Sequence, residues 1–426
     1  MNVYEAARKR IQYAISEFDN IIVSFSGGKD SGVMLNLTLD IAKEMNALDK
    51  VGVYHMDYEA QYQATTDYVS EMFHSLPIEV KKYWVCLPIK AQCSASMFQS
   101  FWQPWKFEDK EIWCRELPKN SINERNFPYS FNYEISDYEF NVQFGKEIAK
   151  TGKTCFLIGI RTQESLNRWR SIHATKGMYK DKRFSTKIAN NLYNVYPIFD
   201  WEVEDVWVYN YKFQKPYNKI YDLFYQAGLT VNAMRVASPF NDCAKSSLKF
   251  YKVIDPNNWG KMISRVNGVN FTALYGDTVA MGWKSIKLPK GHTWKSYMYF
   301  LLDTLPKETK ENYLKKLEVS KKSWRVGGAR DEELIRELEK EGAPVIRTGK
   351  MSKRGSGNKE IIQFEDYLDD TNVTDFAKVP SYKRMCICIM KNDHVCKYMG
   401  FAQTKMEKEK RENVMKKYKN IVRCGR

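Results

Sequence analysis

The feature that most constrains the fold is a short apolar run that leads into a glycine-containing loop and then into an amphipathic segment. The run spans Ile21 to Phe25, apolar residues recur at helical spacing from Gly32 to Met45, and the loop between them reads Ser26-Gly27-Gly28-Lys29-Asp30-Ser31. A short β-branched run is typical of a buried parallel strand, and the apolar spacing that follows is typical of a helix packed on a sheet. The sequence therefore predicts the strand, loop and helix of an α/β protein.

The composition of this loop indicates that it binds an anion. Two glycines let the backbone approach a ligand closely, successive amide groups form a concave nest, and the start of the helix adds its positive dipole end. The loop is not a Walker A motif, because an aspartate follows the lysine and the spacing is shorter. We expect the phosphates of a nucleotide to be bound by Ser24, Ser26, Gly27, Gly28, Lys29, Asp30 and Ser31.

The loop resembles the signature of the ATP pyrophosphatase (adenine nucleotide alpha hydrolase) superfamily. Further stretches are similar to its phosphoadenosine phosphosulfate (PAPS) reductase branch, namely Val51 to Asp57, Gly159 to Ser165 with Arg168, Pro197 to Trp207, and Pro216 to Tyr221. The resemblance implies a doubly wound, mostly parallel sheet, ATP or PAPS as the ligand together with Mg²⁺, and adenylyl or sulfur-group transfer. It also implies that the ligand contacts Gly159, Arg161, Glu164 and Arg168.

Three of these residues are expected to be catalytic. Lys29 binds phosphates, Asp30 positions Mg²⁺ or ribose with help from Asp57, and Arg161 stabilises the charge that develops on the leaving group. Asp57 follows a strand, and ligands of open α/β sheets bind beyond the carboxyl ends of strands. The alternatives are that Asp57 caps a helix and that Arg161 is a surface arginine. We interpret Pro197 to Trp207 as mainly structural, with Asp200 capping a helix.

The chain departs from the reductases that act through a terminal cysteine. Their Glu-Cys-Gly segment is absent, and the nearest equivalent is Cys424-Gly425 after Arg423. Sulfur-group chemistry would therefore need a thiol from this chain or from a partner, with Cys424 as a candidate nucleophile and an ordinary tail cysteine as the alternative. An aromatic and basic insertion from Lys81 to Lys119 is expected either to supply a substrate lid, with Lys106 or Arg115 against phosphate, or simply to pack in the core.

Three domains are predicted from the length and the motifs: residues 1–237 bind the nucleotide, 238–370 form a basic helical domain, and 371–426 carry cysteines. Helices are expected at Leu301 to Leu317, Asp331 to Glu341 and Lys405 to Tyr418, and a hairpin tip or linker at Lys350 to Lys359. In the last domain a Zn²⁺ site can be drawn from Cys386, Cys388, His394 and Cys396, although a buried apolar segment is the alternative. The last domain resembles the C-terminal region of IbrA-type PAPS reductase-like proteins, a likeness that implies a ParB-like partner.

The net charge of +16 points to a polyanionic partner, because one nucleotide site does not need so much positive charge. Nucleic acid is the predicted partner, and solvated lysine-rich helix faces are the alternative. Nine cysteines scattered through a long chain do not form a disulfide framework, which favours a reducing compartment. The sequence has no uncharged apolar run long enough to span a bilayer, so we expect a cytoplasmic protein without a membrane span. A nucleotide-sensing regulatory or defence module is the alternative to an enzyme.

Overall fold

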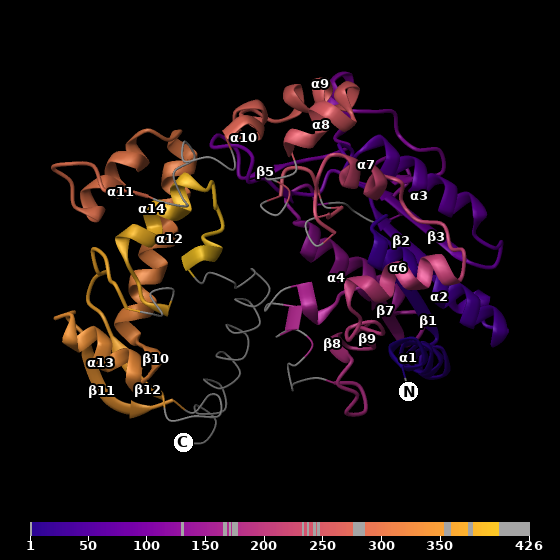
Figure 1. Cartoon of the computed structure of the whole chain (residues 1–426), viewed down its shortest axis with the longest axis horizontal. Coiled ribbons are helices and arrows are strands. Elements are labelled where there is room, and N and C mark those ends of the chain that lie inside the picture. The colour runs from indigo at the N-terminus through magenta and orange to yellow at the C-terminus, as the bar shows by residue number, and fades with distance from the viewer. Residues whose placement is uncertain are drawn as a thin grey trace. The chain divides into compact units, whose positions relative to one another are not determined.

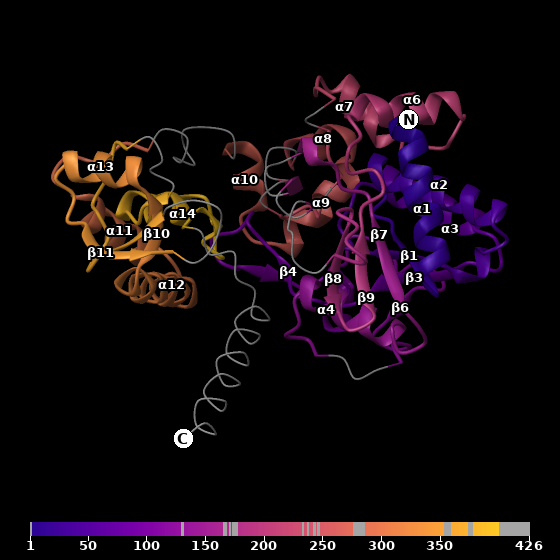
Figure 2. The same cartoon turned by 90° about the horizontal axis from the view of Figure 1, so that it is seen from below.

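The computed structural model describes residues 2–128, 132–164, 168–169, 172, 178–231, 234–236, 238–241, 244, 248–275, 286–352, 359–373 and 378–399. The chain forms two compact units (Figures 1 and 2). Unit 1 comprises residues 1–92 and 101–265, and unit 2 comprises residues 93–100 and 266–426. The sequence-based domain boundaries at 237/238 and 370/371 stay predictions.

Unit 1 is built around a mostly parallel sheet, as predicted. In its described part the seven strands lie in the order β6-β3-β2-β1-β7-β9-β8, and β8 alone runs antiparallel to its neighbour. The strands are β1 (Asn20–Ser24), β2 (Val51–Met56), β3 (Lys81–Cys86), β6 (Ile122–Asn123), β7 (Thr154–Ile158), β8 (Ser185–Ala189) and β9 (Leu192–Val195).

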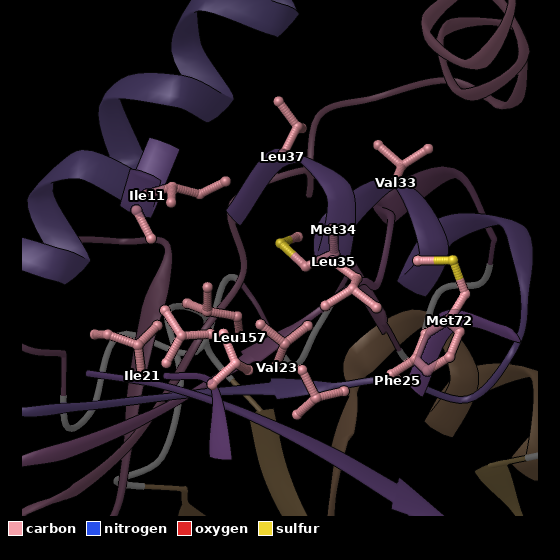
Figure 3. Close-up of a cluster of buried hydrophobic side chains, with 14 of the residues drawn as sticks. Ile11, Ile21, Val23, Phe25, Val33, Met34, Leu35, Leu37, Met72 and Leu157 are labelled. Carbon is pink, nitrogen blue, oxygen red and sulfur yellow. The ribbon is translucent and has the colours of Figure 1, made fainter. Parts of the chain in front are cut away.

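Helices cover both faces of this sheet, each with its own hydrophobic cluster. One face packs against α1 (Val3–Glu17), α2 (Lys29–Glu44), α3 (Gln63–Ser75) and α6 (Val203–Lys212), and Figure 3 shows part of this cluster, including Ile11 of α1 and Met72 of α3. The other face packs against α4 (Asp137–Ile148). The chain winds from β1 through β2 to β3 and later adds β7 on the opposite side of β1. The β1/β7 junction is therefore the topological switch point, where open α/β sheets bind ligands.

The predicted cap of α6 is wrong by two residues. Glu202 and Asp205 form a capping box at the start of this helix. Asp200 instead accepts two hydrogen bonds of 2.7 Å from the Arg10 guanidinium of α1. The carboxylate has a fixed cationic partner, so it ties α1 to the loop before α6 and leaves the cap to Glu202.

Unit 1 also contains shorter elements outside the sheet. The strands β4 (Ala91–Gln92) and β5 (Phe101–Trp102) pair antiparallel at the two points where the chain leaves and re-enters the unit. Three helices follow α6, namely α7 (Ile220–Gln226), α8 (Leu248–Ile254) and α9 (Pro256–Arg265).

Unit 2 is mainly helical, as predicted, and adds a small sheet that the sequence did not predict. The sheet is antiparallel with the order β10-β12-β11, and the stretch from Lys350 to Lys359 joins β11 to β12. The elements are α10 (Val269–Tyr275), α11 (Trp294–Asp303), α12 (Lys307–Val326), β10 (Gly328–Asp331), α13 (Glu332–Lys340), β11 (Ile346–Met351), β12 (Lys359–Gln363) and α14 (Tyr382–Met390).

The helix predicted over Leu301 to Leu317 is two helices, because Pro306 ends the first and begins the second. The helix predicted at Lys405 to Tyr418 lies outside the described residues, as does Cys424. Among the described helices, none combines the length and the apolar character that crossing a bilayer requires.

Candidate functional site

The loop after β1 is folded by hydrogen bonds between its own side chains and backbone. The Ser31 hydroxyl donates to the Gly28 carbonyl at 3.0 Å and accepts from the Ser26 amide at 3.1 Å. The two serine hydroxyls are also 3.0 Å apart. These hydrogen bonds hold the loop against the first turn of α2. Gly28 is the N-cap of this helix, and Lys29 is its first residue. The loop therefore forms the predicted turn between β1 and α2.

Gly27 has no substitute in this turn. Its φ of +77° lies in the left-handed region, and a Cβ there would stand 2.9 Å from Val69 and 3.0 Å from Thr65 of α3. The Gly27 carbonyl accepts from the Asn218 side chain at 2.8 Å, and the Lys29 amide donates to the Tyr221 hydroxyl at 2.9 Å. The segment before α7 therefore supports the loop from outside, in agreement with the resemblance seen at Pro216 to Tyr221.

Lys29, Asp30 and Arg161 form one ionic cluster at the switch point. Asp30 accepts from Arg161 Nε at 2.5 Å and lies 3.3 Å from Lys29 Nζ, so each of its oxygens faces a different cation. All three side chains are buried or nearly so. Burial lowers the pKa of Lys29, the guanidiniums of Arg161 and Arg235 lower it further, and Asp30 acts in the opposite direction. The cluster therefore sets Lys29, Arg161 and, through Glu164, Arg168 against two carboxylates, Asp30 and Glu164.

The other predicted contacts of the loop after β7 lie in the same place. Gly159 allows the close approach of β7 to α2, because a Cβ at this position would stand 3.0 Å from the Asp30 carbonyl. Glu164 lies 3.6 Å from Arg161 and forms an ion pair with Arg168. Ser165 lies outside the described residues. The structure thus brings together Ser24, the Ser26 to Ser31 loop, Gly159, Arg161, Glu164 and Arg168, whose roles toward a ligand stay predictions.

A pocket of about 380 Å³ opens beside the loop on the α4 face of the sheet. Its walls are mainly apolar and include several aromatic rings, and the Tyr54 hydroxyl donates to the Asn141 side chain in the lining. Pockets of this size with apolar walls and a few polar groups are typical of small-molecule sites. Its lining includes Ser24, Phe25, Ser26, Tyr54, Tyr58, Asn141, Phe156, Ile158 and Asn194.

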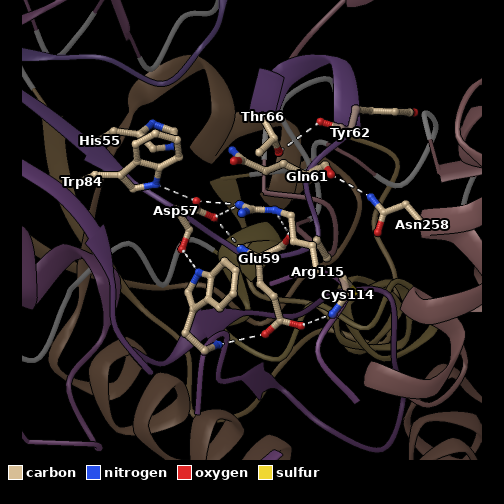
Figure 4. Close-up of polar contacts among 12 residues, drawn as sticks. His55, Asp57, Glu59, Gln61, Tyr62, Thr66, Trp84, Cys114, Arg115 and Asn258 are labelled. Atoms are coloured by element: carbon tan, nitrogen blue, oxygen red, sulfur yellow. Dashed lines mark hydrogen bonds and ion pairs between the residues drawn. The ribbon is translucent and has the colours of Figure 1, made fainter. Parts of the chain in front are cut away.

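Asp57 is fully buried and bonded to protein groups (Figure 4). Arg115 donates to both of its oxygens at 2.5 and 2.6 Å, and Trp84 Nε1 donates to one of them at 2.8 Å. Burial by itself would raise the pKa of Asp57, but Arg115, His55 and Trp84 together outweigh it and hold that pKa below its ordinary value. The predicted contact with ribose or Mg²⁺ has no support from this geometry, because cationic and indole donors occupy both oxygens.

A second buried carboxylate, Glu59, extends this network. It accepts from Arg265 at 2.8 and 2.9 Å and from the amides of Trp105 and Cys114 at 2.8 and 3.0 Å. Its φ is +62°, a conformation that few residues other than glycine adopt. The pair Glu59–Arg265 ties the end of α9 to the segment after β2. We name these four side chains, Asp57, Arg115, Glu59 and Arg265, the buried ion-pair network.

This network also settles how the described insertion residues are used. Of the two cations predicted against phosphate, Arg115 pairs with Asp57 and Lys106 pairs with Glu108. The indoles of Trp84, Trp105 and Trp113 belong to the hydrophobic core. The core-packing alternative therefore describes Trp84, Trp105 and Trp113, and the predicted phosphate contacts of Lys106 and Arg115 have no support.

Of the four residues proposed as zinc ligands, Cys386 and His394 have partners outside the proposed set. Cys386 and Cys388 are two positions apart on α14, and residues at this spacing point to different sides of a helix. The Cys386 thiol donates to the Trp294 carbonyl, while a His394 ring nitrogen lies 2.8 Å from the Ser96 carbonyl. Cys388 and Cys396 are buried in the core of unit 2. In the described part of the chain no group of three or more His, Cys, Asp or Glu side chains is placed to hold a metal ion, so the predicted Zn²⁺ site has no support.

Sequence reasoning missed three residues that shape this region: Arg235, Glu59 as an ion-pair partner, and Arg265. Arg265 meets Glu59 across 206 positions and Arg115 meets Asp57 across 58. Neither motif spacing nor periodicity carries information about such distant pairs. The one available signal was the carboxylate two residues after Asp57, at the same sheet edge.

Comparison with known proteins identifies the class of the chain. The phosphoadenosine phosphosulfate reductase domain matches residues 20–227, and a domain of unknown function, DUF3440, matches residues 228–410. The chain belongs to the PAPS reductase-like family of the adenine nucleotide alpha hydrolase-like fold.

Within this family the uncharacterized protein YbdN of Escherichia coli is 31% identical over 419 residues, which cover 97% of the chain and 94% of YbdN. The uncharacterized protein MJ0066 of Methanocaldococcus jannaschii is 27% identical over 228 residues, 52% of the chain and only 35% of that protein. Among solved structures, a PAPS reductase from Candida auris in a phosphate complex matches 51% of the chain and 85% of its own, with 15% identity and a TM-score of 0.30.

Proposed function

We propose that the chain is an enzyme that binds an adenine nucleotide, ATP or PAPS, and transfers its adenylyl group or a sulfur-containing group. The observation that carries this proposal is the position of the Ser26 to Ser31 loop. It lies at the switch point of a doubly wound sheet, contributes Lys29 and Asp30 to an ionic cluster with three cations and two carboxylates, and borders a mainly apolar pocket. Phosphates in the loop would supply the missing negative charge.

The pocket beside the loop suits the base of the nucleotide. The rings of Tyr58 and Phe156 offer flat apolar surfaces, and base stacking on aromatic side chains is worth about 1–3 kcal/mol per base. Asn194 and Asn141 place amide groups in the same lining, and amides can donate to and accept from a base edge. If the base is bound in this pocket, the phosphates of the nucleotide would extend toward Ser26 and the start of α2.

Lys29 and Arg161 are placed to act on the phosphates. Each is buried and cationic, both face the carboxylate of Asp30, and Arg161 also lies 3.6 Å from Glu164. In adenylyl transfer an acceptor oxygen forms a bond to the α-phosphorus, the bond to the leaving pyrophosphate breaks, and negative charge grows on the pyrophosphate. Fixed cations in a site of low dielectric stabilise that charge without having to reorganise.

The carboxylates predicted to hold Mg²⁺ do not fit that role in this structure. Both oxygens of Asp30 face cations, and both oxygens of Asp57 accept from Arg115. We therefore assign no step to a metal ion.

Sulfur-group transfer would require a thiolate, and the described cysteines are poorly suited to supply one. Cys86, Cys93, Cys114, Cys155, Cys386, Cys388 and Cys396 are all buried. Burial raises the pKa of several of their thiols, including that of Cys386 to about 12. A sulfur reaction would therefore use a thiol other than these seven, such as Cys424 or a thiol of a partner.

The test is to measure ATP and PAPS binding and pyrophosphate release by the full chain, with Lys29→Ala and Lys43→Ala compared. Lys43 is an exposed lysine at the other end of α2, so its replacement removes the same charge without touching the loop. The proposal expects binding and release that Lys29→Ala abolishes and Lys43→Ala preserves. Binding without turnover would favour the nucleotide-sensing alternative, and no binding of either nucleotide would refute both. Repeating the assay with DNA, RNA or a ParB-like protein tests the predicted partners.

A further inference from the structure

A short segment from the region matched by DUF3440 lies against the phosphate loop. The Met234 carbonyl accepts from Lys29 Nζ at 3.4 Å, and the Val236 Cβ lies 3.8 Å from the place where a Cβ on Gly28 would stand. Met234 is buried, so the segment is fixed in this position. The residue between these two contacts, Arg235, is thereby held beside the loop.

Arg235 has no structural task among the residues that the structure describes. Its side chain is exposed, and no carboxylate of the described chain pairs with it. By contrast Arg115, Arg161 and Arg265 all bond to acids. Burial is the main cause of the lowered pKa of Lys29, and the charges of Arg161 and, to a smaller extent, Arg235 act in the same direction. A cation that lies near other cations and has no carboxylate partner raises the free energy of the ligand-free protein. A bound anion lowers that free energy.

We propose that Arg235 binds a second anionic group of the nucleotide, beyond the phosphate held by the Ser26 to Ser31 loop. This inference rests on the proposed function and deepens it, because it names the residue that would hold the second anionic group of ATP or PAPS. The second group is either the outer phosphates of a nucleoside triphosphate or a phosphate on the ribose. Both are recognised by the same guanidinium chemistry, which can donate two parallel hydrogen bonds to one phosphate.

The test compares three probes on the full chain by isothermal titration calorimetry: AMP, ATP and adenosine 3′,5′-bisphosphate. The variants are Arg235→Ala, Arg235→Lys and, as a charge-matched control, Lys43→Ala. We expect Arg235→Ala to weaken at least one of the two richer ligands about tenfold and to change AMP binding less than about twofold. Arg235→Lys should recover part of the loss, and Lys43→Ala should change nothing. The ligand that loses affinity identifies the second group.

Two results would overturn the inference and leave the proposed function standing. One is an equal loss for all three ligands in Arg235→Ala, which would indicate a general electrostatic effect. The other is unchanged binding of all three. If the unmodified chain binds none of the three, the proposed function and this inference fail together. Because Arg235 is exposed, Arg235→Ala should fold like the unmodified chain, which a thermal melt checks.

Discussion

The loops after β1 and β2 leave the same edge of one sheet, and both carry acidic and basic residues, yet their charges are used differently. After β2, Asp57 and Glu59 each meet an arginine in full burial, and their remaining acceptor positions take indole and amide donors. After β1, Asp30 is shared by Lys29 and Arg161, with Arg235 nearby. Carboxylates whose acceptor positions are all filled by protein donors stabilise the fold, whereas cations that outnumber the nearby carboxylates can bind an anionic ligand.

The comparison predicts its largest effect at Glu59. Glu59→Gln leaves the buried Arg265 with the partly exposed Asp109 as its remaining anion, and losing the buried partner of such a pair costs about 3–5 kcal/mol of unfolding free energy. Urea unfolding followed by tryptophan fluorescence measures the loss.

Asp109→Asn is the matched control for Glu59→Gln. Asp109 also pairs with Arg265, at 3.3 Å, but its side chain is 38% exposed. We expect a loss of less than about 1 kcal/mol, because exposed ion pairs contribute little. Equal losses in the two variants would show that burial does not distinguish these pairs.

A slightly smaller loss is expected for Asp57→Asn, about 3 kcal/mol, because the amide still accepts hydrogen bonds from Arg115. The pKa of Asp57 is lower in the folded chain than in the unfolded one. The unfolded chain therefore binds more protons near pH 4, and the unfolding free energy must fall as the pH decreases from about 5 to about 2. That part of the fall should be missing in Asp57→Asn. A pH series of urea unfolding curves measures it, and parallel curves for the two proteins would contradict the ion pair.

Gly27→Ala tests whether the loop after β1 depends on its backbone. The change adds a Cβ at positive φ and within 3.0 Å of two side chains, so we expect a loss of about 2 kcal/mol and weaker nucleotide binding. Gly228→Ala is the control in the same unit, since Gly228 has a φ of +83° and no atom within 4 Å of the added Cβ. It should lose about 1 kcal/mol and bind nucleotide normally. Similar behaviour of the two variants would mean that contact with α3 does not shape the loop.

The smallest change in stability is expected at Lys29. Lys29→Met keeps the length of the side chain and removes a buried charge that its surroundings disfavour, so the unfolding free energy should stay within about 1 kcal/mol or increase. Nucleotide affinity should still fall by at least about tenfold. Thermal melts paired with calorimetric titrations separate the two effects. A large loss of stability would place Lys29 with the structural pairs of the loop after β2.

The sequence predicted the fold of unit 1 better than the roles of its charged residues. The strand expected at Ile21 to Phe25 and the helix expected from Gly32 correspond to β1 and α2, because periodicity and glycine placement are local signals. Asp57 was placed correctly at the end of β2, but its partner lies far along the chain. The sheet of unit 2 was missed because β11 is mostly exposed and polar, so it has no apolar alternation.

Residues 93–100 leave unit 1 between β4 and β5 and belong to unit 2, where the Ala95 carbonyl accepts from Thr272 at 2.7 Å and the Ser96 carbonyl contacts His394. The gene therefore encodes unit 2 in two separated pieces. A crossover near codon 266 would transplant a unit lacking eight of its residues, and a ribosome must make more than 160 intervening residues before the pieces can meet. Recombination that transfers one unit without the other would therefore give an incomplete unit 2, and we expect the two units to be inherited together.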